Sequence, residues 1–288
     1  MIYRSLSSYF KEKYGKKIKK ICIDGGFTCP NRDGKCSSGG CIFCGGRGAG
    51  EHIEENLSVS RQVGIFFENP TKADGYIAYF QNFTNTYAPV PVLKKRYDDA
   101  LIDDRIMILS VGTRPDCITE EIADLLASYK DRVDVFCELG LQTSSDKTAR
   151  IINRGYKTEV YERAVEILAS RGIEVVTHIM IGLPGEGDEE LKETVKLINS
   201  LPVSGIKIHS VYVMEGTKLA EMYRRGEYTP ISMDDYIDRA VYALSHLRRD
   251  IVVHRITGDC PEALLVAPEW NRQKSRVIAK IQKRLAEL

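Results

Sequence analysis

Four of the eight cysteines in this chain fall within sixteen residues, at positions 29, 36, 41 and 44, whereas those at positions 22, 117, 137 and 260 are scattered. Clustered thiols in a reducing compartment indicate a metal site rather than disulfides. Cys41 and Cys44 enclose Ile42 and Phe43 in a glycine-rich loop. A two-residue spacer lets both thiolates face one metal centre, and flanking glycines let the backbone approach the sulfurs.

Two kinds of metal site fit these cysteines. All four thiols could close a tetrahedral zinc site, whereas Cys29, Cys41 and Cys44 alone form a C-x11-C-x2-C pattern that suits an iron–sulfur cluster. Zinc ribbons usually pair two C-x2-C knuckles, and this chain has one such knuckle. The loop also follows an expected strand, and the aromatic Phe43 suits an organic cofactor stacked beside a cluster. These observations favour iron–sulfur, and zinc remains the alternative.

The elements around this loop are expected to be short buried strands that alternate with helices. Apolar, β-branched runs without strict alternation are typical of parallel strands covered on both faces. These runs occupy residues 18–23, 76–80, 106–111, 133–139, 174–181, 206–213 and 251–256. Helical patterns occupy residues 119–130, 159–171, 189–200, 233–248 and 270–288.

Polar and glycine residues crowd the carboxyl ends of successive strands. Examples are Asp24, Gln81, Thr113, Gln142 and the segment 182–185. Such groups converge only if the strands curve around a common centre, so an α/β partial (β/α)6 barrel is preferred to an open sheet. We expect a basic lead-in at 1–17, a barrel over 18–230 with its metal loop at 25–50, and a C-terminal extension over 231–288 that ends in a basic amphipathic helix.

Charge is distributed unevenly although the formal net charge is +1. Residues 1–20 carry seven basic side chains and one acidic, and residues 270–288 carry six and one, on an otherwise acidic body. The two basic ends would make a phosphate-binding surface if they meet in space, or they are solvated helix faces. No apolar run approaches the roughly 20 residues that cross a bilayer. The expectation is a cytoplasmic protein without a membrane segment.

Several segments carry motifs that resemble those of the radical S-adenosylmethionine (radical SAM) superfamily. The long first cysteine spacer and the segments GTRPD and ELGLQT resemble the radical domain of the Elongator catalytic subunit, and looser likenesses extend to oxygen-independent coproporphyrinogen oxidases. The segments DGGFTCPNRDG, YFQ and HRITGD look like the bacterial YhcC/YtqA family. The full set of motifs comprises residues 24–34, 79–81, 84–87, 112–116, 138–143, 152–156, 178–185 and 254–259.

The resemblance implies a [4Fe–4S] cluster and S-adenosylmethionine (SAM) as cofactors. Cys29, Cys41 and Cys44 would hold three irons, and the fourth iron would bind the amino and carboxylate groups of SAM. Cys36 stands where relatives lack cysteine and is left out of the ligand set. Phe43 would lean on the adenine, and Gln81 would contact the methionine amine.

Four further residues are candidate cofactor contacts by the same resemblance. Gln142 and Arg154 match contacts of coproporphyrinogen oxidases, and His178 lies where those enzymes place a ribose-binding carboxylate. Glu138 is expected to point into the barrel, where a charge needs a partner. Structural alternatives remain: Gln142 caps a strand end, Arg154 pairs with Glu138, and His178 is a hydrogen-bonded core residue.

The implied activity is reductive cleavage of SAM to a 5′-deoxyadenosyl radical. Likeness to the Elongator radical domain points to the C5 side chain of tRNA wobble uridine, in the route from carboxymethylaminomethyl to aminomethyl uridine. The expected partners are tRNA, bound through the basic ends, and an electron donor such as flavodoxin or ferredoxin. The alternatives are a radical enzyme for a small metabolite such as a tetrapyrrole, and a non-catalytic zinc-dependent RNA-binding module.

Overall fold

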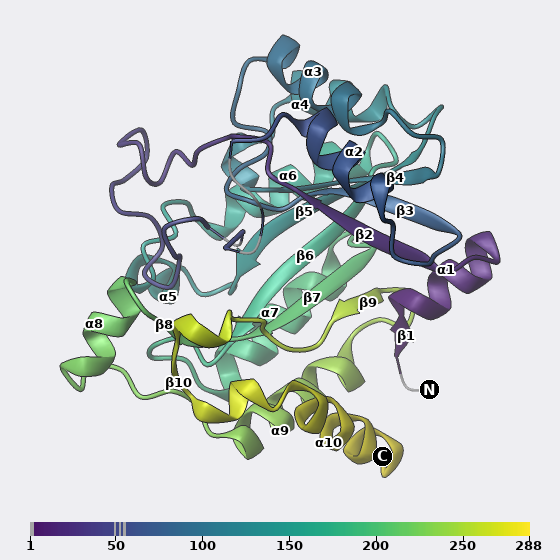
Figure 1. Cartoon of the computed structure of the whole chain (residues 1–288). Helices are drawn as coiled ribbons and strands as arrows, with labels where there is room; N and C mark the ends of the chain where they lie inside the picture. The colour runs from purple at the N-terminus through teal and green to yellow at the C-terminus, as the bar shows by residue number, and fades with distance from the viewer. Residues whose placement is uncertain (1–2, 49, 52, 54–55) are drawn as a thin grey trace.

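The main sheet of the protein has eight parallel strands and curls into a half-barrel (Figure 1). The computed structural model describes residues 3–48, 50, 51, 53 and 56–288. The strand order is β1-β9-β7-β6-β5-β4-β3-β2, so β1 and β2 form the two open edges. The strands are β1 (Arg4–Ser5), β2 (Ile18–Ile23), β3 (Gly75–Phe80), β4 (Ile106–Thr113), β5 (Asp134–Gln142), β6 (Glu174–Ile181), β7 (Gly205–Ser210) and β9 (Val252–Arg255). The expected partial barrel is confirmed.

The sheet is wider than the six strands expected, because both ends of the chain join it. β9 pairs with β7 and β1 pairs with β9, so the segments before residue 18 and after residue 230 complete the half-barrel. A separate antiparallel pair, β8 (Val213–Met214) with β10 (Leu265–Ala267), lies beside the loop that carries the cysteines. Parallel neighbours require long crossovers, and helices supply most of them.

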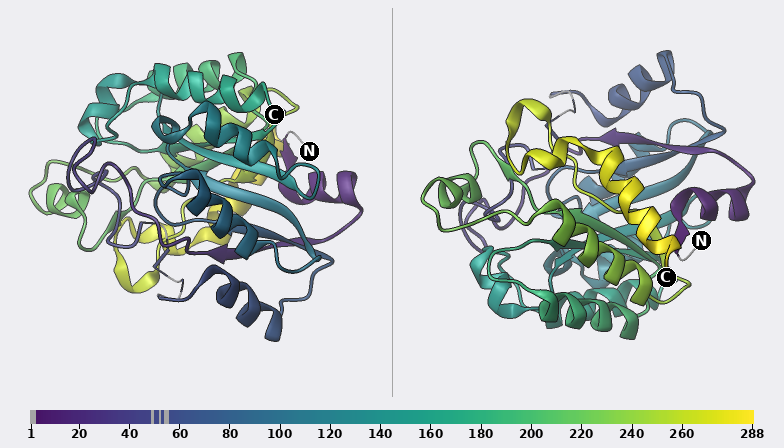
Figure 2. Two further views of the ribbon diagram at one scale, coloured as in Figure 1. Left: turned by 90° about the horizontal axis from the view of Figure 1, so that it is seen from above. Right: turned by 90° about the horizontal axis from the view of Figure 1, so that it is seen from below.

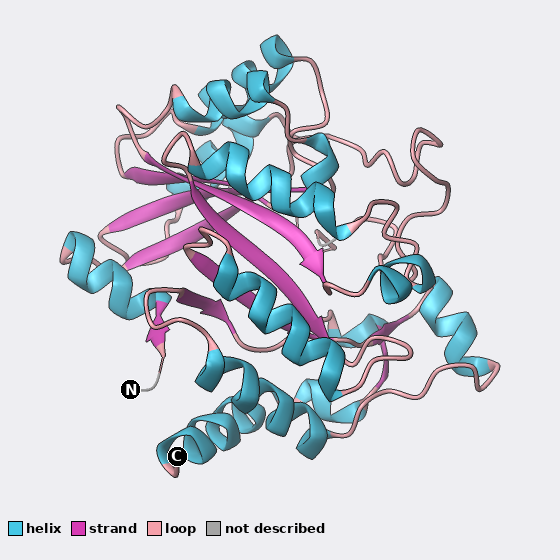
Figure 3. Ribbon diagram, turned by 180° about the vertical axis from the view of Figure 1, so that it is seen from behind, coloured by secondary structure: helices cyan, strands magenta, loops and turns pink. Residues whose placement is uncertain are grey.

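Helices pack over the outer face of the sheet, as seen from behind (Figure 3). Each expected helix is present, and the last is split at Gln273 into a short turn, Glu269–Arg272, and α10. Thr119 caps α4 by accepting a hydrogen bond from the backbone of Ile122. The helices are α1 (Leu6–Tyr14), α2 (Val59–Glu68), α3 (Val90–Ala100), α4 (Glu120–Ala127), α5 (Asp146–Ile151), α6 (Thr158–Ala169), α7 (Asp188–Ser200), α8 (Lys218–Arg224), α9 (Met233–His246) and α10 (Lys274–Ala286).

Side chains on the inner face of the half-barrel form layers, because alternate residues of each strand point inward. The layer nearest the amino-terminal ends of the strands is apolar and includes Ile108, Phe136 and Val176. Tyr9 and Phe10 of α1 pack against this layer and close that end of the barrel. The layers above it are polar, so the cavity of the barrel opens towards the carboxyl ends of the strands.

The basic ends of the chain lie near each other, at the end of the molecule opposite the cysteine loop (Figure 2). Lys13 of α1 forms ion pairs with Asp134 and Glu174, which begin strands β5 and β6. Lys280 and Arg284 of α10 pair with acidic residues of α9. Within the described part of the chain, no helix is long and apolar enough to span a membrane.

Candidate functional site

A cavity of about 280 Å³ lies inside the half-barrel, towards the carboxyl ends of the strands. Cys29, Cys41 and Cys44 line it together, as the C-x11-C-x2-C pattern predicts. Cys36 does not line this cavity: its side chain is exposed, faces a different hollow and donates a hydrogen bond to Asp116 over 3.7 Å. The structure therefore separates Cys36 from the other three thiols.

The cysteine loop is anchored by residues 152–155, which follow α5. The backbone N–H of Ile42 donates to the carbonyl of Ile152, and the side-chain amide of Asn153 donates to the carbonyl of Gly40 over 2.8 Å. Gly155 has a φ of 84°, and a Cβ there would stand 2.7 Å from the buried side chain of Asn31. These contacts give the motif at residues 152–156 a role in shaping the loop.

Two side chains donate hydrogen bonds around the thiols. The amide of Asn31 lies 3.6 Å from the sulfur of Cys41, and the guanidinium of Arg32 donates to the carbonyls of Cys44 and Gly45. Burial raises the pKa of Cys41 to about 12, and the nearby Cys44 thiol contributes to this rise. Because a ligating thiol must be deprotonated, donors such as Asn31 and Arg32 suit a bound thiolate.

The number and placement of the thiols bear on the kind of metal centre that they suit. Thiolates on a four-iron cluster each bind a different iron, so they surround a space instead of converging on a point. Three thiols around one cavity, with a fourth set apart, therefore fit a cluster that has one open iron.

All six of the expected cofactor contacts line the same cavity: Phe43, Gln81, Glu138, Gln142, Arg154 and His178. Gln142 ends β5 with a φ of 60°, at a bulge in the pairing between β5 and β6. Positive φ in a residue other than glycine costs about 1–3 kcal/mol and is concentrated at functional sites. This backbone conformation turns the end of β5 at the mouth of the cavity.

Arg154 also borders the cavity, but its guanidinium is used inside the protein. Its side chain is 1% exposed. All five of its N–H groups donate to protein oxygens, namely the carbonyls of Leu141, Thr143 and Tyr156, the hydroxyl of Thr158 and the carboxylate of Asp146. The alternative pairing with Glu138 is wrong, because Arg154 holds the carboxyl end of β5 instead.

Glu138 and His178 belong to a buried polar network in the layer below the thiols. Ser110 and His178 each donate to the Glu138 carboxylate over 2.8 Å, and Lys207 of β7 donates to it as well. Lys207 also donates to the hydroxyl of Tyr79 over 3.1 Å. Glu138 thus points into the barrel, as expected, and its partner is Lys207.

The network shifts the pKa values of its members in directions that follow from burial. Burial by itself would raise the pKa of Glu138, but Lys207 and the His178 hydrogen bond hold it well below its usual value. Burial lowers the pKa of Lys207 to about 7 and that of His178 to about 4. At neutral pH the carboxylate is ionised and His178 is uncharged, so His178 donates to Glu138 as a neutral ring.

Sequence reasoning missed three polar side chains of the inner face: Lys207, His209 and Arg255. All three line the cavity. A signal was available, because positions 205, 207 and 209 alternate Gly, Lys and His between isoleucines and a serine. Alternation of this kind indicates one polar and one apolar face of a strand.

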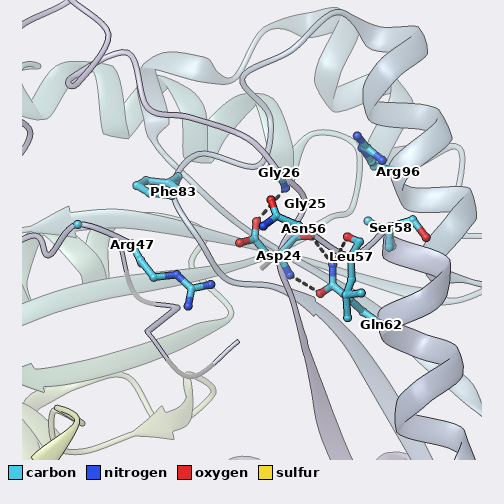
Figure 4. A pocket seen from close by; sticks show the side chains of 12 residues that line it. Asp24, Gly25, Gly26, Arg47, Asn56, Leu57, Ser58, Gln62, Phe83 and Arg96 are labelled. Carbon is cyan, nitrogen blue, oxygen red and sulfur yellow. Dashed lines mark hydrogen bonds between the residues drawn. The ribbon is translucent and has the colours of Figure 1, made fainter. Parts of the chain in front are cut away.

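A second cavity, of about 500 Å³, lies between the cysteine loop and α2 (Figure 4). No cysteine is among its described lining residues. The carboxylate of Asp24 there accepts hydrogen bonds from the backbone of Gly26 and the amide of Asn82, each over 2.8 Å. Gln62 of α2 binds the backbone of Asp24 at both its N–H and its carbonyl. These hydrogen bonds hold the start of the cysteine loop in place. The smaller cavity, which contains the thiols, is the candidate site.

The chain belongs to the radical SAM superfamily. A family model described as "Radical SAM superfamily" matches residues 33–198, and a model described as "Radical_SAM C-terminal domain" matches residues 203–287. Within the superfamily, the chain is a member of the family that includes YtqA and YhcC. It is 38% identical to YtqA of Bacillus subtilis over 98% of this chain and 89% of YtqA. It is 36% identical to YhcC of Escherichia coli over 96% and 89% of the two chains.

More distant likenesses extend to two archaeal proteins. A tRNA uridine(34) acetyltransferase of Methanocaldococcus infernus is 33% identical over 56% of this chain and 30% of its own length. The solved structure of archaeal Elp3 from the same organism, with its N-terminus deleted, superposes with a TM-score of 0.69 at 21% identity. That superposition covers 93% of this chain and 63% of Elp3, and it confirms the fold.

Family membership identifies the cofactors as a [4Fe–4S] cluster and SAM. The donor set fits this pair, since three thiols line a cavity that also presents Phe43 and Gln81. The expected iron–sulfur site is therefore supported over the zinc alternative, and the chain is an enzyme of the radical SAM class.

Proposed function

We propose that this protein is a radical SAM enzyme that modifies the C5 side chain of the wobble uridine of tRNA, in the route from carboxymethylaminomethyl to aminomethyl uridine. The observation that carries the proposal is the 33% identity to a tRNA uridine(34) acetyltransferase over 166 residues. The chain spans about a third of that relative, so acetyl transfer itself is not part of the proposal.

The residues of the cavity have separate roles in this activity. Cys29, Cys41 and Cys44 would hold the cluster, with Asn31 and Arg32 donating hydrogen bonds around it. When bound, the cluster and SAM supply a 5′-deoxyadenosyl radical that abstracts hydrogen from the substrate. The cavity beside the thiols, of about 280 Å³, would receive the reacting group of a substrate, and the closed amino-terminal end of the barrel would exclude water from that side.

The tRNA would contact the protein in two places: the mouth of the cavity, and the end of the molecule where the basic termini lie. An anticodon loop is single-stranded, so a wobble base can turn out of it into a cavity without breaking a base pair. The basic ends of the chain lie at the opposite end of the molecule (Figure 2), so they would contact a part of the tRNA remote from the anticodon.

Mass spectrometry of tRNA nucleosides tests the proposal. A strain that lacks the gene should accumulate carboxymethylaminomethyl uridine and lose the nucleosides made from aminomethyl uridine. The wild-type gene should restore the original pattern, a Cys36→Ala gene should restore it as well, and a Cys41→Ala gene should not. An unchanged set of wobble nucleosides in the deletion strain would contradict the tRNA substrate and leave a small-molecule radical reaction to be sought.

A further inference from the structure

The cavity that holds the thiols is lined by more positive than negative side chains. Its described lining residues include five cations and one carboxylate, that of Glu138. Four of the cations are engaged inside the protein. Arg32 donates to carbonyls of the loop, Arg114 pairs with Asp116, Arg154 holds the end of β5, and Lys207 pairs with Glu138.

Arg255, at the end of β9, is the fifth cation, and its charge is poorly compensated. Its closest acidic atom is Oδ2 of Asp259 at 3.9 Å, and that carboxylate already accepts a hydrogen bond from Lys274 over 2.9 Å. No hydrogen bond from the guanidinium to another described residue is present. The side chain is 35% exposed and lines the cavity, in register with Lys207 of the neighbouring strand.

His209 supplies a second uncommitted donor on the same wall. Its Nε2 atom is buried and has no hydrogen-bond partner within the described part of the chain. The ring lies 5.2 Å from that of His178 and lines the cavity two residues beyond Lys207 on β7. A buried ring nitrogen without a partner costs free energy, so it marks a position where a ligand atom would restore a hydrogen bond.

We propose that Arg255 and His209 form an anion subsite in the cavity, and that it binds the carboxylate of the substrate. This inference rests on the proposed function, because the carboxymethylaminomethyl side chain ends in a carboxylate. A guanidinium presents paired N–H groups that match the two oxygens of a carboxylate, and the neutral ring of His209 adds a third donor. Lys207 lies beside the subsite, and its ion pair with Glu138 offsets the negative charge of the carboxylate in the cavity lining.

The subsite gives a role to the two uncommitted donors on the side of the cavity formed by β7 and β9. A carboxylate held at Arg255 would set the remainder of the side chain towards the centre of the barrel. Removing the charge of the substrate, without changing its size, should therefore weaken binding as much as removing the guanidinium.

The test compares three anticodon stem-loops as ligands of the anaerobically reconstituted full-length protein with a SAM analogue bound. They carry carboxymethylaminomethyl uridine, its carboxamide, or unmodified uridine at the wobble position. Calorimetry should show that the wild type binds the carboxylate about 10- to 100-fold more tightly than the carboxamide. In Arg255→Gln the two affinities should become equal. In His209→Gln the ratio of the two affinities should fall by about 3- to 10-fold, and in Arg255→Lys part of the preference for the carboxylate should remain. Arg249→Gln, an exposed arginine just before β9, is the matched control and should behave as the wild type.

A second arm omits RNA. In ligand-observed NMR titrations, N-methylglycine should bind the wild type and not Arg255→Gln, whereas N-methylglycinamide should bind neither. If N-methylglycine depends on Arg255 while no stem-loop binds, the subsite stands and the tRNA substrate is wrong.

Three results would overturn the subsite. The first is equal binding of carboxylate and carboxamide in both arms. The second is an equal decrease in affinity for all three stem-loops in Arg255→Gln, which would indicate a backbone phosphate contact. The third is weakened binding of the SAM analogue in Arg255→Gln, which would assign the guanidinium to the cofactor.

Discussion

Some side chains around the cavity are placed to contact a ligand, whereas others hold the surrounding backbone in position. Cys41 and Cys44 border the cavity beside two hydrogen-bond donors, whereas Cys36 is exposed and bound to Asp116. Gln142 lines the cavity and has a strained backbone conformation. Arg154, in contrast, donates all of its N–H groups to the strand that carries Gln142 and to the segments beside that strand.

Cys41→Ala and Cys44→Ala should each abolish cluster binding and SAM cleavage, while Cys36→Ala should retain both. The reason is that Cys36 faces a different hollow from the other three thiols. Iron content and 5′-deoxyadenosine formation would be measured after anaerobic reconstitution, where the wild type should be brown and hold about three to four irons. A loss of iron in Cys36→Ala as large as in Cys41→Ala would overturn the ligand assignment.

Arg154→Ala should lower the free energy of unfolding by about 3 kcal/mol or more, because it leaves buried carbonyls without donors. Affinity for an unreactive SAM analogue should fall as a consequence, since the end of β5 loses its support. Chemical denaturation and calorimetry would report the two quantities separately. Weakened analogue binding at unchanged stability would instead indicate that the guanidinium contacts the cofactor directly.

His178 should make the protein less stable as the pH falls. Its pKa is lowered from 6.5 to about 4, chiefly by burial, so between these values the unfolded state binds a proton that the folded state does not. The unfolded state is therefore favoured on acidification through this range, by up to about 3 kcal/mol. Urea unfolding of the protein between pH 7 and 4 should show a shallower decrease in stability for His178→Gln than for the wild type. Equal slopes would mean that His178 does not contribute.

At the scale of elements, two segments bound the cavity at its two ends. They are α1, at the amino-terminal ends of the strands, and residues 152–155, beside the cysteine loop. The apolar side of α1 closes the barrel, and its basic residue Lys13 pairs with the first residues of β5 and β6. The segment after α5 meanwhile fixes the cysteine loop at the other end. Neither element belongs to β7 or β9, the strands that carry the proposed anion subsite.

Phe10→Ala should destabilise the protein by about 3–5 kcal/mol, because it leaves a cavity among buried rings and aliphatic side chains. Lys11→Ala, on the exposed side of the same helix, should change the stability by less than about 0.5 kcal/mol. Thermal and chemical unfolding would measure both variants. A Phe10→Ala protein as stable as Lys11→Ala would show that α1 does not seal the barrel.

At the scale of the whole molecule, the charges of the two ends gather away from the cavity. The termini lie near each other, yet Lys280 and Arg284 already pair with Asp234 and Asp238 of α9. The basic face of α10 is thus partly neutralised within the protein, and Lys283 is its most exposed cation among these three.

Replacing Lys280, Lys283 and Arg284 by Gln should weaken tRNA binding and reduce its salt dependence. Removal of one phosphate contact lowers the slope of log K against log salt by about 0.7–0.9. Because Lys280 and Arg284 have acidic partners on α9, we expect the slope to change by the equivalent of a single phosphate contact. Lys192→Gln with Lys196→Gln on α7 is the control. A slope equal to that of the wild type would remove this helix from the RNA interface.

The sequence alone determined which cysteines share a cavity, the alternation of strands and helices, and the strand ends that surround the site. These features are local, because cysteine spacing, buried apolar runs and glycine-rich turns act over a few residues. The partial barrel was predicted from polar residues at several strand ends, because these residues can form one site only if the strands curve around a common centre.

Only the tertiary structure decided which side chains face each other inside the barrel. Glu138 meets Lys207 and His178 across three strands, and Arg255 joins that wall from a segment expected to be an extension of the barrel. Such partners are far apart in the sequence, and their meeting depends on strand order, register and curvature. A shift of one residue in register would have turned each of them to the opposite face, so no local pattern could specify the pairs.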